Sequence, residues 1–384
     1  MRRHLAAACL GITLAANGGV AAAQDTALPR IPQTLRAGQA CTPPSGKKVP
    51  EVPWQLPYLG ADRLWPLTTG KGVTVAVVDT GVDTSVTPAE VLGDAGSDCV
   101  GHGTVLASLI AAPAKDGGKG SGLAPAARVV AARGTDKFGV ATGASIAAGI
   151  DAAVAAGARI VCVGAVTAED APVLRQAVDR AVAAGALVVA AAGPDSGARR
   201  SGAPSTYYPA ALPGVLSVAA IGPDGRPAAD AVAGTLAAPG DLVVGTGPGG
   251  GQVVAAGPAF AAAHVAAAAA LVRAYRPELT MADVARRLRE TAYRQPGNAV
   301  VDPLAALTTG LTSGGSSSVR RDAVVVRDIP DFSGARGAAL TVAGGVALGI
   351  CLLAAVAVVV PRGRRRGWRA GPVDSAEMSG APGT

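Results

Sequence analysis

The chain has 384 residues and a formal net charge of +7, and 49% of its residues are hydrophobic but only 3% are aromatic. A single core can grow to roughly 250 residues before a chain splits into domains, so we expect one large domain with appendages, its core built from Ala and Val. The charge does not predict nucleic-acid binding, because part of it lies near the two ends and no basic surface interleaved with aromatic residues lies between them.

The first 23 residues have the order of a secretory signal. Arg2 and Arg3 precede an apolar stretch from residue 5 to 16, and small residues at 21–23 stand before Gln24. This charged, apolar, small-residue order predicts cleavage near Gln24. The alternative, a short membrane anchor, is disfavoured because the apolar run is too short to span a bilayer.

Residues 24–58 are rich in proline and polar residues, which predicts an extended arm without regular structure. From residue 73 onward, apolar β-branched runs alternate with Ala-rich stretches. The expected strands are 73–78, 128–132, 159–163, 186–191 and 215–220, and the expected helices are 102–112, 143–156, 172–184, 259–275 and 281–291. Continuous apolar strands that alternate with helices predict an α/β domain, here 59–309, whose parallel sheet is covered on both faces.

The C-terminal region carries a second membrane signal. Residues 310–336 begin with a Gly/Ser/Thr-rich stretch that predicts a flexible linker. The uncharged apolar stretch 337–360 has about the roughly 20 residues needed to cross a bilayer, and a cluster of arginines follows at once in the tail 361–384. The positive-inside rule places this tail in the cytoplasm and the domain outside it. A buried core helix is the disfavoured alternative, because no other segment is long enough to cover all its faces.

The cysteines indicate one disulfide. Cys9 lies in the predicted signal and Cys351 in the predicted membrane helix, which leaves three others. In an oxidising compartment we expect Cys41 to pair with Cys99. Cys162 lies inside an apolar run, where a buried free thiol is expected.

Two polar side chains mark the carboxyl edge of the predicted sheet. Asp79 follows the first strand directly, and His102 opens a helix between two glycines. Parallel α/β folds carry their sites at this edge, and Asp79 could orient His102 by accepting its ring N–H. In this order and spacing, Asp-Thr-Gly at 79–81 and Gly-His-Gly-Thr at 101–104 resemble the subtilisin family of serine peptidases, whose triad runs Asp, His, Ser along the chain. The resemblance implies a three-layer subtilisin-like fold.

The nucleophile implied by the resemblance is missing. The family pattern Gly-Thr-Ser-hydrophobic-Ala-Ala-Pro-His-Val-Ala aligns with residues 257–266, which read Gly-Pro-Ala-Phe-Ala-Ala-Ala-His-Val-Ala, so Ala259 stands where serine should be. No serine lies between Ser217 and Ser313, and no cysteine lies between 162 and 351. An alanine methyl cannot attack a carbonyl, and the sequence offers no local replacement.

A second family residue is also changed. The family has an oxyanion-stabilising asparagine in an Ala-Ala-Gly-Asn pattern, whereas residues 191–194 here end in Pro194, which has no side-chain donor and no N–H. In subtilisin itself, losing the nucleophile costs about a millionfold in turnover and losing the asparagine costs roughly a hundred- to thousandfold. We therefore expect near-background activity. Asp79 and His102 are then expected to persist as a hydrogen-bonded structural pair, and His264 is expected to be structural.

Further features narrow the resemblance to the mycosins, membrane-anchored subtilisin-like peptidases of type VII secretion. These are the signal, the proline-rich arm with Cys41, the position of Cys99 just before the histidine motif, and the C-terminal membrane helix with its basic tail. The resemblance implies that the arm wraps the domain and that the protein associates with subunits of the secretion membrane complex. No cofactor is implied, and the three histidines lack the spacing of metal ligands.

Three functions remain open from the sequence. The chain is a pseudo-peptidase that serves as a structural subunit of the secretion complex, a module that holds secreted polypeptides along its sheet edge without cleaving them, or an active endopeptidase with an unfamiliar site that processes secreted proteins. The missing nucleophile favours the first.

Overall fold

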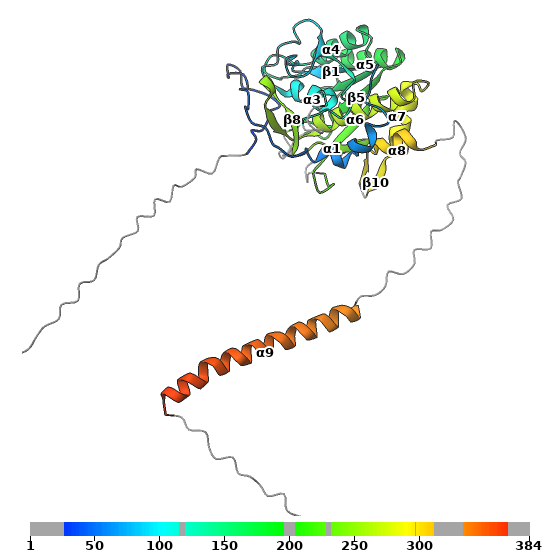
Figure 1. Cartoon of the computed structure of the whole chain (residues 1–384). Helices are drawn as coiled ribbons and strands as arrows, with labels where there is room; N and C mark the ends of the chain where they lie inside the picture. Colours follow the sequence, from blue (N-terminus) through cyan, green and yellow to red (C-terminus); the bar gives the residue numbers. More distant parts are fainter. Residues whose placement is uncertain are drawn as a thin grey trace, which may run out of the picture. The chain divides into compact units, whose positions relative to one another are not determined.

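The computed structural model describes residues 27–114, 120–195, 204–227, 232–295, 297–310 and 333–367, and it divides the chain into two units, 1–312 and 313–384 (Figure 1). The predicted signal at 1–23, most of the predicted linker 310–336 and most of the predicted tail 361–384 lie outside the described residues. The domain boundaries at these ends therefore stay predictions.

A nine-stranded sheet forms the middle layer of the first unit, in the order β10-β11-β7-β6-β5-β4-β1-β3-β2. Its strands are β1 (Thr74–Asp79), β2 (Ala89–Val91), β3 (Arg128–Arg133), β4 (Ile160–Val163), β5 (Leu187–Ala191), β6 (Leu216–Ile221), β7 (Leu236–Pro239), β10 (Tyr293–Gln295) and β11 (Asn298–Val300). Neighbouring strands pair in parallel except in the β10–β11 hairpin. The predicted α/β fold with a parallel sheet is confirmed.

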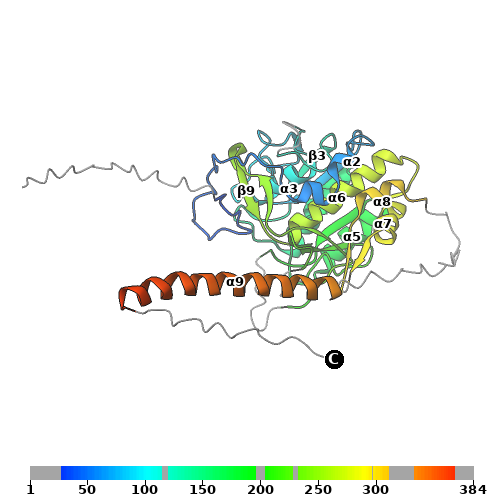
Figure 2. The same cartoon turned by 60° about the horizontal axis from the view of Figure 1, so that its bottom comes forward.

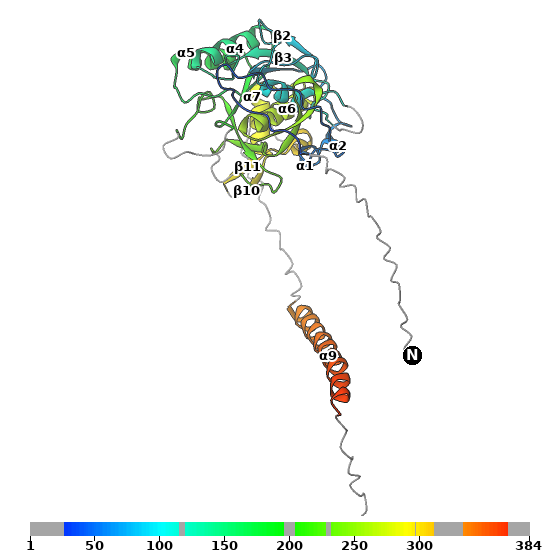
Figure 3. The same ribbon diagram turned by 90° about the vertical axis from the view of Figure 1, so that its left-hand side faces the viewer.

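Helices cover both faces of this sheet. In β1, Val75 and Val77 belong to one buried cluster together with α3 (His102–Ala111) and α6 (Pro258–Tyr275). Ala76 and Val78 belong to a second cluster with α4 (Gly143–Ala155) and α5 (Pro172–Ala183), which lie side by side in Figure 3. Successive side chains of a strand point to opposite faces, so this division gives the three layers that the resemblance implied.

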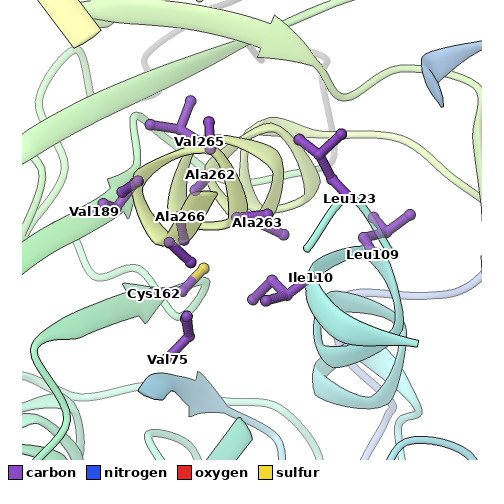
Figure 4. Close-up of a cluster of buried hydrophobic side chains, with 14 of the residues drawn as sticks. Val75, Leu109, Ile110, Leu123, Cys162, Val189, Ala262, Ala263, Val265 and Ala266 are labelled. Atoms are coloured by element: carbon purple, nitrogen blue, oxygen red, sulfur yellow. The ribbon is translucent and has the colours of Figure 1, made fainter. Parts of the chain in front are cut away.

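Helix α6 fills the centre of the first helical layer. Every residue from Pro258 to Val272 is buried, and its alanines lie against Cys162 and Val189 of the sheet and Ile110 of α3 (Figure 4). Small side chains let the helix approach the sheet closely, so the core is rich in Ala and Val as expected. Although α6 is apolar and long enough to cross a membrane, 83% of it is buried inside the domain, which makes it a core helix.

Helix α7 (Met281–Glu290) begins at its predicted residue. Several other elements were not predicted, namely the strands β2, β7, β10 and β11 of the sheet, the helices α1 (Gln55–Tyr58), α2 (Ala61–Leu64) and α8 (Pro303–Thr308), and the hairpin of β8 (Val243–Thr246) and β9 (Gln252–Ala255). This hairpin lies beside α3 in Figure 2. Helix α1 corrects the expectation of no regular structure before residue 58. The Gln55 side chain donates to Val244 O over 2.7 Å, a long-range contact with no local sequence signal.

The N-terminal arm lies extended along the domain, as expected. Arg30 forms a parallel bridge with Val254, and Leu35 N–H donates to Phe138 O over 2.8 Å. Farther along, Cys41 and Cys99 form a disulfide. The arm is thus held to the domain by backbone pairing near its start and by a covalent bond farther along.

The second unit contains α9 (Ser333–Arg365). Its segment Thr341–Arg365 has a mean hydropathy of 2.6 and none of it is buried, which makes it a candidate membrane span. The helix begins ahead of the predicted residue 337 and continues past Pro361, and its candidate span overlaps most of the predicted segment 337–360. The arginines near its end therefore lie in its last turn.

Candidate active site

Asp79 ends β1 at the carboxyl edge of the sheet. Its Oδ1 lies 2.7 Å from Nδ1 of His102 and accepts the N–H of Thr80 over 2.8 Å. The Asp79 and His102 side chains are both 2% exposed. The structure thus brings together the two residues that the sequence assigned to this edge.

The start of α3 fixes the position of His102. The carboxylate of Asp98 accepts the N–H of Gly101 over 2.7 Å and the N–H of Thr104 over 2.8 Å. It therefore satisfies donors that the first turn of a helix leaves free. Gly101 has φ of +86°, and a Cβ there would come within 2.5 Å of Pro248, so only glycine fits before His102.

The other ring nitrogen of His102 contacts a second carboxylate. Its Nε2 lies 2.6 Å from Oδ2 of Asp195, a residue that follows β5 and is 5% exposed. The Oδ1 of Asp195 accepts the N–H of Ala259 over 3.0 Å. Asp195 therefore bridges the imidazole and the N-terminus of α6.

Ala259, at the expected place of the nucleophile, is fully buried in the first turn of α6. The N-cap residue, Gly257, supplies no side-chain cap, and the free N–H of Ala259 is instead satisfied by Asp195. The carboxylate thus takes a helix-capping role at the point where a serine hydroxyl would otherwise meet His102.

A cleft of about 320 Å³ opens beside these residues, and Pro194, Tyr207 and residues 164–168 line it. The arm closes part of it. Gln33 and Thr34 form part of the lining, and Gln33 Oε1 accepts the N–H of Asp195 over 3.1 Å. The arm therefore contacts the site itself as well as the outside of the domain.

The two carboxylates determine the charge of the imidazole. Burial, the largest single influence, lowers the pKa of His102, but Asp79 and Asp195 together raise this pKa well above its ordinary value. Burial raises the pKa of Asp195, and the hydrogen bond and charge of His102 reduce this rise but do not cancel it. Ionised carboxylates only accept hydrogen bonds, so the arrangement holds His102 as an imidazolium that donates to both. Such a ring has no lone pair with which to activate a nucleophile.

Comparisons with known proteins identify the family. The model of the Subtilase family matches residues 70–319. Mycosin-4 of Mycobacterium tuberculosis (strain ATCC 25618 / H37Rv) is 30% identical over 413 aligned residues, which cover 89% of each chain. This chain belongs to the mycosins of the subtilase family.

Two examples show that solved structures are also similar to this chain. One is of MycP1, a serine protease described as an essential component of the type VII (ESX-1) secretion system. It is 31% identical with a TM-score of 0.63, over 71% of this chain and 93% of that one. The other is the periplasmic assembly of the ESX-5 inner membrane complex, in which the matched chain is 27% identical with a TM-score of 0.61, over 76% of this chain and 94% of that one.

Neither the remaining cysteine of the domain nor its second histidine supplies a reactive group at the site of this mycosin. Cys162 lies in β4, and burial raises the pKa of its thiol, which keeps it protonated. His264 lies farther along α6, where its Nδ1 is 2.8 Å from Pro239 O and burial lowers its pKa to about 4. Among the described residues, no group of three acidic, histidine or cysteine side chains could hold a metal.

Asp195 was missed in the sequence of this mycosin. Asp195 carries neither a hydroxyl nor a thiol, and it lies outside the family's motifs. The available signal was its place directly after Pro194, at the carboxyl edge of β5, where side chains reach the site. Gln33 carried no signal, because its role depends on the path of the arm.

Proposed function

We propose that this mycosin is a non-catalytic subunit of a type VII secretion membrane complex. The observation that carries the proposal is the bridge of Asp195 between His102 and the N–H of Ala259. It leaves the site with a methyl group in place of the nucleophile and with a base already bound to two carboxylates. A protein that keeps the whole fold without catalysis acts by binding other molecules at its surface.

The likeness to MycP1 and to the ESX-5 periplasmic assembly supports the secretion role. Under this proposal α9 is the single membrane span, the folded domain lies outside the cytoplasm and the arginine-rich end lies inside. A peptide-holding role is less well supported, because Gln33 and Thr34 of the arm line the cleft that a peptide would enter.

A fluorophosphonate probe tests the loss of catalysis. We expect the detergent-solubilised full-length protein to stay unlabelled, because Ala259 has no hydroxyl and His102 is bound to two carboxylates. The triple variant Ala259→Ser, Pro194→Asn, Asp195→Gly is the positive control for an accessible site. Labelling of the wild type that is reduced by added peptide substrates would mean that this mycosin is an active peptidase.

Affinity purification from mildly solubilised membranes tests the secretion role. We expect subunits of the secretion membrane complex to co-purify with the tagged protein, and equally with the Ala259→Ser variant, because the role does not need the site. Migration of the tagged protein alone, under conditions that keep the complex together, would contradict the proposal.

A further inference from the structure

Both oxygens of Asp195 are bound by strong donors. Oδ2 lies 2.6 Å from His102 Nε2, and Oδ1 accepts the N–H of Ala259 over 3.0 Å. The Asp195 and His102 side chains are 5% and 2% exposed. A carboxylate is costly to bury unless it is hydrogen-bonded and paired with charge. This one meets both conditions, through groups from two different helices.

The two donors exist independently of Asp195. The N–H of Ala259 is one of the N–H groups that the first turn of every α-helix leaves without an internal partner, and α6 has no side-chain cap of its own. The helix dipole adds partial positive charge at this end. His102 is oriented by Asp79 on the opposite side of its ring, so its Nε2 faces the same point whether or not Asp195 is present.

The surrounding backbone leaves room for a carboxylate at that point. Gly257 has φ of +150°, and a Cβ on it would lie 2.0 Å from Oδ1 of Asp195. Any side chain at 257 would therefore displace the carboxylate. The donors and the space fit one small planar anion with two oxygens.

We infer that the former catalytic centre of this mycosin is a carboxylate-binding site whose resident ligand is the Asp195 side chain. A small monocarboxylate such as formate or acetate is the class of ligand that replaces it. Bound in this way, Asp195 also presents its backbone N–H to Gln33, so the filled site holds the arm across the cleft. The inference concerns the same site as the proposed loss of catalysis, but it is tested by binding and not by activity.

The variant Asp195→Gly empties the site and tests the inference in the full-length protein in detergent. We expect its Tm to rise with added sodium formate, by about 4 °C for each tenfold increase above Kd. Sodium chloride at the same ionic strength gives the baseline. The wild type should show no rise beyond that baseline, because its site is already filled.

The matched control is Asp195→Asn, which keeps the shape of the side chain and removes its charge. This variant should lose stability relative to the wild type and should not respond to formate, because the amide still occupies the space. A formate response in Asp195→Asn equal to that of Asp195→Gly would show binding elsewhere and would overturn the inference.

Histidine signals supply a second readout. The chain has three histidines, and the first lies in the predicted signal, so His102 and His264 are the two expected in the mature protein. In protein labelled with ¹⁵N at histidine, formate should shift the ring signals of His102 in Asp195→Gly and leave those of His264 unchanged. If the glycine variant does not fold, Asp195→Ala takes its place, and the wild-type spectrum must show both ring nitrogens of His102 protonated near pH 7. A neutral His102 in that spectrum, or no saturable shift in either variant, would refute the site.

Discussion

His102 lies between two carboxylates, with Asp79 2.7 Å from Nδ1 and Asp195 2.6 Å from Nε2. In a working triad the second nitrogen is free to take a proton from the nucleophile. Here the buried carboxylate of Asp195 is bound to this nitrogen. Three residues therefore distinguish this site from a working triad, namely Pro194, Asp195 and Ala259, and each has its own physical effect.

Restoring the serine alone should not restore reactivity. In Ala259→Ser, the imidazole remains bound to Asp195 and has no lone pair for the new hydroxyl, so we expect no fluorophosphonate labelling above wild type. Adding Asp195→Gly should allow slow labelling, and adding Pro194→Asn should increase its rate by roughly a hundred- to thousandfold. The rate of in-gel labelling is measured for the single, double and triple variants. Equal labelling of the single and double variants would mean that Asp195 does not block the base.

The stability of the domain should fall on the alkaline side. His102 in the folded state keeps its proton above about pH 6.5, where an unfolded histidine loses it. Its contribution is therefore complete below that pH and is lost as pH rises toward the raised pKa, with a slope of up to about 1.4 kcal/mol per pH unit. Asp79 on β1 and Asp195 are the titratable groups whose hydrogen bonds and charges act on this ring.

Urea unfolding at closely spaced pH values measures that slope. The control is Asp195→Asn, in which His102 keeps only one ionised partner, so the alkaline loss should become smaller. A free energy of unfolding that is flat between about pH 6.5 and 9 in the wild type would contradict an imidazolium at this site.

His264 should act in the opposite direction. Burial lowers its pKa to about 4, so the folded state binds fewer protons than the unfolded state below about pH 6.5. Stability is then lost as pH falls from about 6.5 to 4, by about 3 kcal/mol in total. The variant His264→Gln keeps a polar side chain and should abolish this part of the acid loss. If that variant loses as much stability as the wild type between about pH 6.5 and 4, other groups cause the loss.

The sequence predicted the sheet and its main helices well because these elements carry strong local signals. The β4 and β5 runs are apolar throughout, and β1 is apolar between Thr74 and Asp79; such strands occur in parallel sheets with both faces covered. Short elements such as α1 depend on contacts with distant residues, as Gln55 does with Val244. Asp79 and His102 were identified by motif and spacing. Asp195 was not identified, because it contacts His102 at the place where the absent serine hydroxyl would lie, and no local sequence pattern encodes that geometry.

The disulfide should stabilise the domain by closing a long loop. Cys41 and Cys99 are 58 residues apart in sequence, and in the chain-entropy model a loop of this length contributes about 4 kcal/mol. The double variant Cys41→Ser, Cys99→Ser should lower the free energy of unfolding by about 2–4 kcal/mol in urea titrations. Cys351→Ala in α9 is the matched control and should leave the unfolding of the domain unchanged. If reduction of the wild type has no effect on its unfolding, the arm is held by its other contacts alone.

The direction of α9 across the membrane can be tested with single reporter cysteines. We expect a cysteine at Ser313→Cys to react in intact cells with a thiol reagent that cannot cross the membrane, because the positive-inside rule places this end outside. A cysteine at Gly363→Cys, among the arginines of the last turn, should react only after the cells are opened. Both variants are made in a Cys351→Ala background to remove the native thiol of the helix. The reverse pattern would mean that α9 has the opposite orientation in the membrane and that the domain lies in the cytoplasm. A disulfide between Cys41 and Cys99 would not be expected to persist there.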